Sequence, residues 1–244
     1  MKPVVIILRR ELASYFATPI AYVVLVIFLL LANLMAFWFG GLYERGQADL
    51  APFFNFLPWL YLFLIPAVSM RLWSEERRNG SIELLLTQPV TLWQAVLGKF
   101  LAAWVFVGIA LALTFPIWIT INYLGNPDNG TILAAYLGSL FVAGGFLAVG
   151  SLMSSLTKNQ LVAFLLAGWF CFMFLLAGFA AVTDWLGSWA PQWLVAGVTS
   201  LSFLTHFENI TKGVLDLRDV LYYSAVIVFF LLASTVVLDV RKSK

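Results

Sequence analysis

The sequence predicts an all-α membrane protein with six transmembrane helices, built as a single transmembrane domain over residues 1–244. Apolar residues make up 62% of the chain and charged residues only 11%, which is far outside the range of soluble domains. A membrane-spanning helix needs about 20 apolar residues, so this length has room for about six. The net charge of +2 and the lack of a basic block argue against a nucleic-acid partner.

Six apolar stretches have the length of a membrane span, and polar segments rich in Gly, Asn, Asp and Pro separate them. Three prolines, Pro58, Pro66 and Pro116, fall inside these stretches and predict kinks. The predicted spans are Ile20–Phe39, Phe53–Leu72, Val96–Tyr123, Ile132–Leu156, Leu161–Val182 and Val220–Leu238.

The N-terminal residues 1–17 predict an amphipathic helix that lies on the inner leaflet of the membrane. Its apolar residues recur near helical spacing, opposite Lys2, Arg9 and Arg10. A signal peptide is the alternative. It is disfavoured because the next apolar run is long enough to span and lacks a small-residue cleavage site. The apolar residues are Val5, Leu8, Leu12, Tyr15 and Phe16.

A charged island, residues 74–99, lies between the second and third apolar stretches. Ser81 can cap a helix, Glu83 then lies in its first turn, and Gln88-Pro89 ends it. Such a helix has barely two turns and gains stability from packing. Thr91 and Gln94 form a T-x-x-Q capping box, so the helix of the third span begins directly afterwards.

Residues 183–218 predict an outer helical hairpin before the sixth span. The stretch from Asp184 to Thr205 is apolar enough to be a seventh span, but Pro191 and Gly197 interrupt it. Its tryptophans suit a membrane interface, where the indole ring lies in lipid and its N–H stays wet. We therefore expect a re-entrant or surface-lying pair of helices. The tryptophans are Trp185, Trp189 and Trp193.

Basic residues favour the cytoplasmic side and set the orientation. With six spans, eleven fall on one face and three on the other, whereas a seventh span would make the division ten against four. Both termini and the island are therefore predicted to be cytoplasmic. The eleven are Lys2, Arg9, Arg10, Arg71, Arg77, Arg78, Lys99, Lys158, Arg241, Lys242 and Lys244, and the three are Arg45, Lys212 and Arg218.

The chain carries no signature of an enzyme or of an ion-coupled transporter. Gly98-Lys99 is followed by Phe100, so no P-loop is present, and the spans lack the central carboxylates that proton relays use. Cys171 and His206 are each the only residue of their type, which argues against a metal site. A transporter of this kind must take its energy from a partner.

Small residues recur along the fourth span at Gly144, Ala148, Ser151 and Ser155, and they permit close helix contact. We interpret this seam as packing within the chain. Six helices make a small bundle, so a pathway for a large cargo forms more readily between two bundles. We therefore expect a homodimer or a pair with a homologous permease.

The run Glu76-x-x-x-Gly80-x-x-Glu83-Leu84-Leu85-Leu86-x-x-Pro89, followed by Gly98-Lys99, resembles the signature of ABC-2 permeases, the membrane subunits of type-2 ABC exporters. The amphipathic start, the six spans and the outer hairpin match that family over almost the whole chain. The segments around His206–Ile210, Lys212–Val214 and Asp216–Tyr223 further resemble the GldF-like gliding-motility permeases.

This resemblance implies a permease of the bacterial inner membrane that works with a separate cytoplasmic ABC ATPase, which would hold the ATP and Mg. Residues 74–90 would form a coupling helix that docks into the ATPase, and residues 1–17 a connecting helix with Arg9, Arg10 and Glu11. The alternative for the island is a solvated loop. The implied docking residues are Glu75, Glu76, Gly80, Glu83, Leu84, Leu85 and Leu86.

The sequence leaves two candidate functions open. The first is a permease that exports or extrudes a substrate when its partner hydrolyses ATP. The second is a membrane anchor of an ATPase-driven mechanical or assembly complex, in which nothing crosses the membrane. The resemblance also implies a GldG-like accessory protein, and membrane lipid would surround the chain. An intramembrane enzyme is disfavoured, because no span holds a paired acid or an HExxH.

Overall fold

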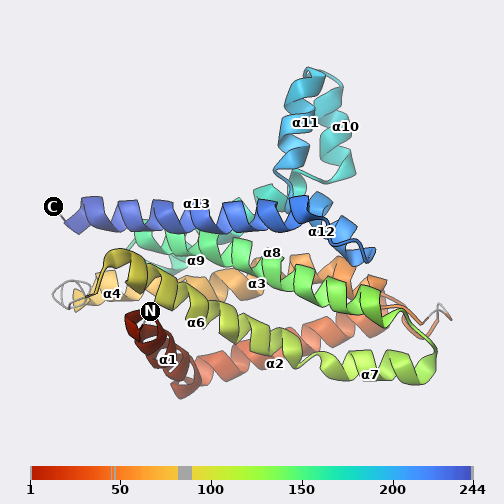
Figure 1. Ribbon diagram of the computed structural model, residues 1–244, viewed down its shortest axis with the longest axis horizontal. Helices are drawn as coiled ribbons and strands as arrows, with labels where there is room; N and C mark the ends of the chain where they lie inside the picture. Colours follow the sequence, from red (N-terminus) through yellow and green to blue (C-terminus); the bar gives the residue numbers. More distant parts are fainter. Residues whose placement is uncertain (1, 45, 47, 82–89, 243–244) are drawn as a thin grey trace.

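A computed structural model describes residues 2–44, 46, 48–81 and 90–242, and every regular element in these ranges is helical. Long helices run side by side, and one short helical pair projects away from them (Figure 1). The elements are α1 (Lys2–Ala17), α2 (Pro19–Leu34), the π-helix η1 (Met35–Phe39), α3 (Ala51–Ser69), α4 (Arg71–Asn79), α6 (Leu92–Ala112), α7 (Phe115–Leu124), α8 (Asn129–Leu156), α9 (Gln160–Leu176), α10 (Ala180–Gly187), α11 (Gln192–Ser200), α12 (Phe203–Thr211) and α13 (Leu217–Lys242).

Five helical segments of the described chain are long and apolar enough to cross a membrane, judged by length and composition. A sixth arises only if α9 and α10, which meet at a bend of 69°, are counted as one span. The predicted fifth span was Leu161–Val182, whereas α9 ends at Leu176. The five segments are Pro19–Phe39, Ala51–Asn79, Leu92–Leu124, Asn129–Leu156 and Leu217–Val240.

The second of these segments extends beyond its predicted end at Leu72. After an interruption at Met70, α4 continues the helix through the charged residues to Asn79, and Gly80 ends it in a left-handed conformation with φ of 71°. Glycine adopts this conformation without the steric cost that a Cβ brings. The first part of the island is therefore a helical extension of the span.

The predicted proline kinks are found in part. The helix is interrupted at Leu113 and Thr114, directly before Pro116, which occupies the first turn of α7. Another interruption, at Met70, follows Pro66. Pro58 lies inside the continuous helix α3.

The helix α8 forms the centre of the bundle. It contacts α3, α6, α9, α12 and α13, and it is the most buried of the five segments. The seam of small residues faces these neighbours: a Cβ on Gly144 would lie 2.9 Å from Ile227 Cδ1, and Ala148, Ser151 and Ser155 are buried. Its interpretation as packing within the chain is confirmed.

Side chains cap several helix starts. The predicted capping box at Thr91 is confirmed, because the Gln94 N–H donates to Thr91 Oγ1 and the Thr91 N–H donates to Gln94 Oε1. Asp128 caps α8 by accepting from the N–H groups of Gly130 and Thr131 and from the Thr131 hydroxyl. These bonds, the side-chain bond from Thr131 foremost, lower the pKa of the Asp128 carboxyl.

The N-terminal segment is a helix, as predicted, but protein covers part of its apolar stripe. Leu12, Tyr15 and Phe16 pack against the core, and the Tyr15 and Phe16 rings lie 5.0 and 5.6 Å from the Phe106 ring of α6. The exposed apolar residues of α1 include Ile6 instead. Contact with α6 therefore holds α1 in place.

The predicted hairpin is smaller than residues 183–218. The two short helices α10 and α11 contact each other and contribute no buried residue, and they project from the bundle (Figure 1). The tryptophans at 185, 189 and 193 are exposed. The next helix, α12, belongs to the bundle instead, because Phe203, Phe207 and Ile210 are buried against it.

His206 connects three helices next to the hairpin. His206 Nδ1 lies 2.6 Å from Asp219 Oδ1, its Nε2 lies 3.2 Å from the Ser200 carbonyl, and its ring stacks on Tyr222. These contacts join α12 to the start of α13 and to the end of α11. No group of residues that could hold a metal ion is found in the described part of the chain.

The close approach of α8 to α3 predicts the effect of one substitution. A Cβ on Gly150 would lie 2.1 Å from Ser69 Oγ and 2.5 Å from Ser69 Cβ, so Gly150→Ala forces the helices apart. We expect a loss of about 1–3 kcal/mol, the usual cost of overpacking. Thermal unfolding of the purified protein in detergent measures it.

Gly187→Ala is the matched control, because nothing lies within 4 Å of its added Cβ and alanine favours a helix. Equal melting temperatures for the two variants would contradict the packing described here.

Candidate functional site

A buried lysine joins three helices at one end of the bundle. The side chain of Lys99, in the second turn of α6, is only 3% exposed, and its Nζ lies 2.8 Å from Glu76 Oε1 of α4 and 3.4 Å from Glu11 Oε1 of α1. The ring of Trp73, also on α4, lies 5.2 Å from the same Nζ. A buried cation needs such partners, because an unpaired one costs several kcal/mol.

The residue before the lysine lets α1 approach α6 closely. A Cβ on Gly98 would lie 2.8 Å from Ile7 Cγ2 and 3.2 Å from the Val4 carbonyl oxygen. Only glycine fits this crossing without displacing α1. Gly98 therefore brings α1 near, and Lys99 binds it through Glu11.

A serine of α8 binds the interruption between α3 and α4. The Ser154 hydroxyl accepts from the N–H groups of Trp73 and Ser74 and donates to the Met70 carbonyl. The Ser154 hydroxyl thus supplies hydrogen bonds to main-chain groups that have no helical partner at the break. Ser151 adds a bond from the Trp73 indole N–H, at 3.1 Å.

The far end of α4 also holds α8. The Arg77 guanidinium donates to the Ser155 carbonyl at 2.6 Å, within the last turn of α8. Carbonyls in the last turn have no helical partner, and a cation there complements the helix dipole. Contacts on two sides, from α6 and from α8, therefore fix α4.

We call these residues the α4 platform, meaning Glu11, Trp73, Glu76, Arg77, Lys99, Ser151, Ser154 and Ser155. It lies at the end of the bundle where α6 begins, α8 ends and the C-terminal end of α13 lies (Figure 1). Helix α4 ends at Gly80, so the platform contains the described part of the predicted coupling-helix region 74–90.

The predicted docking residues fall into two groups. Of the described ones, Glu75 and Gly80 are exposed, whereas Glu76 points inward to Lys99 and its side chain is only 19% exposed. The second carboxylate oxygen of Glu76 is buried with no hydrogen-bond partner, so Lys99 offsets the cost of burying this group. The remaining residues, Glu83, Leu84, Leu85 and Leu86, lie outside the described residues.

The predicted connecting-helix residues also differ from one another. Arg9 and Arg10 are exposed, and Arg10 pairs with Glu11 at 2.7 Å. Glu11 is the residue that reaches Lys99. Burial first, and then the charge of Glu11, raises the pKa of Tyr15, which lies one turn further on.

Sequence reasoning missed the role of Lys99. It appeared only at the end of the Gly98-Lys99 motif and among the basic residues that set the orientation. The available signal was a lysine on the first helical turns of an apolar span, where a charge is costly without a partner. Its partners, however, come from two other helices.

Comparison with known proteins gives a family match. The family model of the ABC-2 family transporter proteins matches residues 60–240, which contain α4 and the whole of α6. Two curated relatives, from Escherichia coli K12 and Escherichia coli O157:H7, are each described as a probable multidrug ABC transporter permease, YbhR. Both are 28% identical over 144 residues, or 58% of this chain, and the match spans only 37% of their own length.

The buried ion pairs predict the effect of removing the cation. Lys99→Met leaves Glu11 and Glu76 without it, and we expect a loss of about 3–5 kcal/mol of stability. Adding Glu76→Gln should restore part of this loss, since the orphaned charge is then gone. Urea unfolding of the two variants, followed by tryptophan fluorescence, measures the difference. A double variant no more stable than Lys99→Met would contradict the pairing.

Proposed function

The chain belongs to the ABC-2 family of transporter membrane proteins, and we propose that it is the permease subunit of an ABC transporter that exports or extrudes a substrate. The ATP would be hydrolysed by a separate cytoplasmic ABC ATPase, and the chain itself would bind no nucleotide. The sequence supports this division, since it contains no P-loop.

The observation that carries the proposal is the α4 platform. Residues 74–90 are the proposed coupling-helix region, and α6 and α8 hold its described part, α4, on two sides. A segment that transmits force must be attached to something rigid, and α4 has that attachment. In this proposal Glu76 acts by positioning α4, whereas Glu75, Glu83 and Leu84 to Leu86 contact the ATPase.

The proposed location is a bacterial inner membrane with both termini and the α4 platform on the cytoplasmic side. The positive-inside rule supports it. The described basic residues at the platform end include Arg9, Arg10, Arg77 and Arg78, whereas Lys212 and Arg218 lie at the opposite end. The hairpin of α10 and α11 would then be external, with its tryptophans at the outer interface.

The assembly that we propose contains two permease copies, or one copy and a homologous permease, with two ATPases. The small size of the bundle supports this. The GldF-like segments, such as Asp216–Tyr223, support a gliding-motility-like subfamily with a GldG-like accessory protein. The relatives' description as multidrug permeases concerns those proteins, and their cargo is not assigned to this chain.

The second candidate function is a membrane anchor for an ATPase-driven mechanical or assembly complex. The GldF-like segments favour it. It needs the same platform and the same docked ATPase, but no substrate crosses. ATP-dependent uptake of dye-like amphipathic compounds into inverted vesicles would support export, whereas normal ATPase activity without any transport would favour the anchor.

Loss of the docking residues should release the ATPase. We expect Glu83→Lys with Leu85→Lys to reduce ATPase co-purification with the tagged chain by at least tenfold, since each change places a new cation in a desolvated interface. Lys212→Glu with Arg218→Glu, at the opposite end, is the matched control. Unaltered co-purification by the docking variant would count heavily against the proposal.

The orientation can be tested with single cysteines, because Cys171 is the only native one. In a Cys171→Ala background, Trp193→Cys of α11 should react with an impermeant maleimide on intact cells. Arg78→Cys of α4 should react only after the cells are opened. Labelling of Arg78→Cys from outside would place the platform where no ATPase reaches it.

A further inference from the structure

A polar cleft opens between α1 and α4, beside the platform. It encloses about 130 Å³ and is lined by Ser14 and Thr18 as well as by charged residues. Arg71 lines it, and the Nε of its guanidinium is buried with no hydrogen-bond partner. A buried cationic donor without a partner is costly and indicates an acceptor that the protein chain does not supply.

Two carboxylates share this cleft with Arg71. Glu11 is already engaged by Arg10 and Lys99, but no ion pair of Glu75 is found in the described part of the chain. The unengaged charges are therefore one guanidinium and one carboxylate. This pair is complementary to a ligand that carries one anion and one cation.

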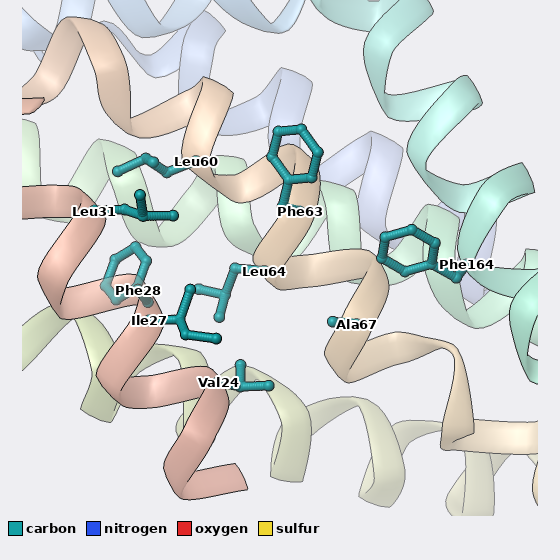
Figure 2. Close-up of a pocket in the computed structure, with 9 residues that line it drawn as sticks. All are labelled: Val24, Ile27, Phe28, Leu31, Leu60, Phe63, Leu64, Ala67 and Phe164. Carbon is teal, nitrogen blue, oxygen red and sulfur yellow. The ribbon is translucent and has the colours of Figure 1, made fainter. Parts of the chain in front are cut away.

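A separate apolar groove lies between α2 and α3, the helices that follow α1 and precede α4 in the chain. It encloses about 230 Å³ between α2 and α3, and Figure 2 shows their side chains facing each other across it, with Phe164 of α9 nearby. On the α3 side, Leu60, Leu64 and Ala67 follow the i, i+3, i+4 spacing that leads on to Arg71 and Glu75. The groove and the cleft therefore occupy one face of the continued helix.

The dimensions match a lipid. By helical rise, Arg71 lies roughly 6 Å beyond Ala67, and Thr18 roughly 9 Å before Val24. The stretch from Val24 to Leu31 adds about 10 Å of apolar wall. A small polar headgroup in the cleft would therefore lie next to an acyl chain in the groove. The charged residues of the cleft are at the end of the span, where a headgroup lies.

We propose that this face binds a phospholipid with a zwitterionic, primary-amine headgroup, phosphatidylethanolamine. Its phosphate accepts from Arg71, its ammonium donates to Glu75, and one acyl chain lies in the groove. A quaternary choline headgroup has no N–H for Glu75, and a glycerol headgroup has no cation, so both bind less well. Glu75 is shared with the proposed docking surface, whereas Arg71 and the groove are not.

The test uses purified, delipidated protein and an equimolar mixture of palmitoyl-oleoyl lipids with ethanolamine, choline and glycerol headgroups, read by native mass spectrometry. We expect the ethanolamine lipid to be retained about tenfold over the other two, as one charge-assisted hydrogen bond allows. Arg71→Gln should lower its retention by a similar factor, whereas Arg78→Gln, an exposed arginine on α4, should not. Equal retention of the three lipids, or retention by Arg71→Gln equal to that of Arg78→Gln, overturns the proposal.

A second variant tests the groove without touching a charge. Ala67→Phe fills it and should lower retention of the ethanolamine lipid, while Ala112→Phe, at an exposed position of α6, should leave it unchanged.

Soluble phosphoethanolamine should protect the protein against heat much less than the lipid does. Equal protection by the two ligands, or unchanged retention in Ala67→Phe, overturns the two-part site. Co-purification of an ATPase is expected to be normal in Ala67→Phe, so that failure here and failure of the proposed function are distinguishable.

Discussion

The burial of one cation organises the platform end of this molecule. Lys99 is enclosed, so its charge must be balanced from within, and the balancing carboxylates come from α1 and α4. The charge of Lys99 therefore ties both α1 and α4 to α6. Such a pair is weak as a source of net stability, because desolvation cancels much of the attraction, but it is strongly specific about which helices meet.

The serines of α8 add a second constraint of a different kind. Ser154 forms hydrogen bonds with main-chain groups at the interruption between α3 and α4. The helix can therefore break there without leaving these buried polar groups unpaired. As a result α4, which continues the span beyond a short interruption, is held at Lys99 and at α8.

The sequence predicts well those features that depend on residues close together in the chain, and it predicts poorly those that depend on distant ones. The all-α class, most of the spans and the Thr91 capping box depend on residues within a few positions of one another, and the sequence pattern reveals them directly. The bend between α9 and α10 was not predicted. The apolar stripe of α1 faces α6 because of contacts with a ring far along the chain, Phe106. The Glu11–Lys99–Glu76 group was missed for the same reason. The residues are adjacent only in the folded chain.

The hairpin of α10 and α11 stands apart from the bundle. None of its residues is buried, and the His206 contacts with Asp219 and Ser200 lie at its base. Its three exposed indoles contribute nothing to the core and are free to meet whatever lies beyond the protein's own helices.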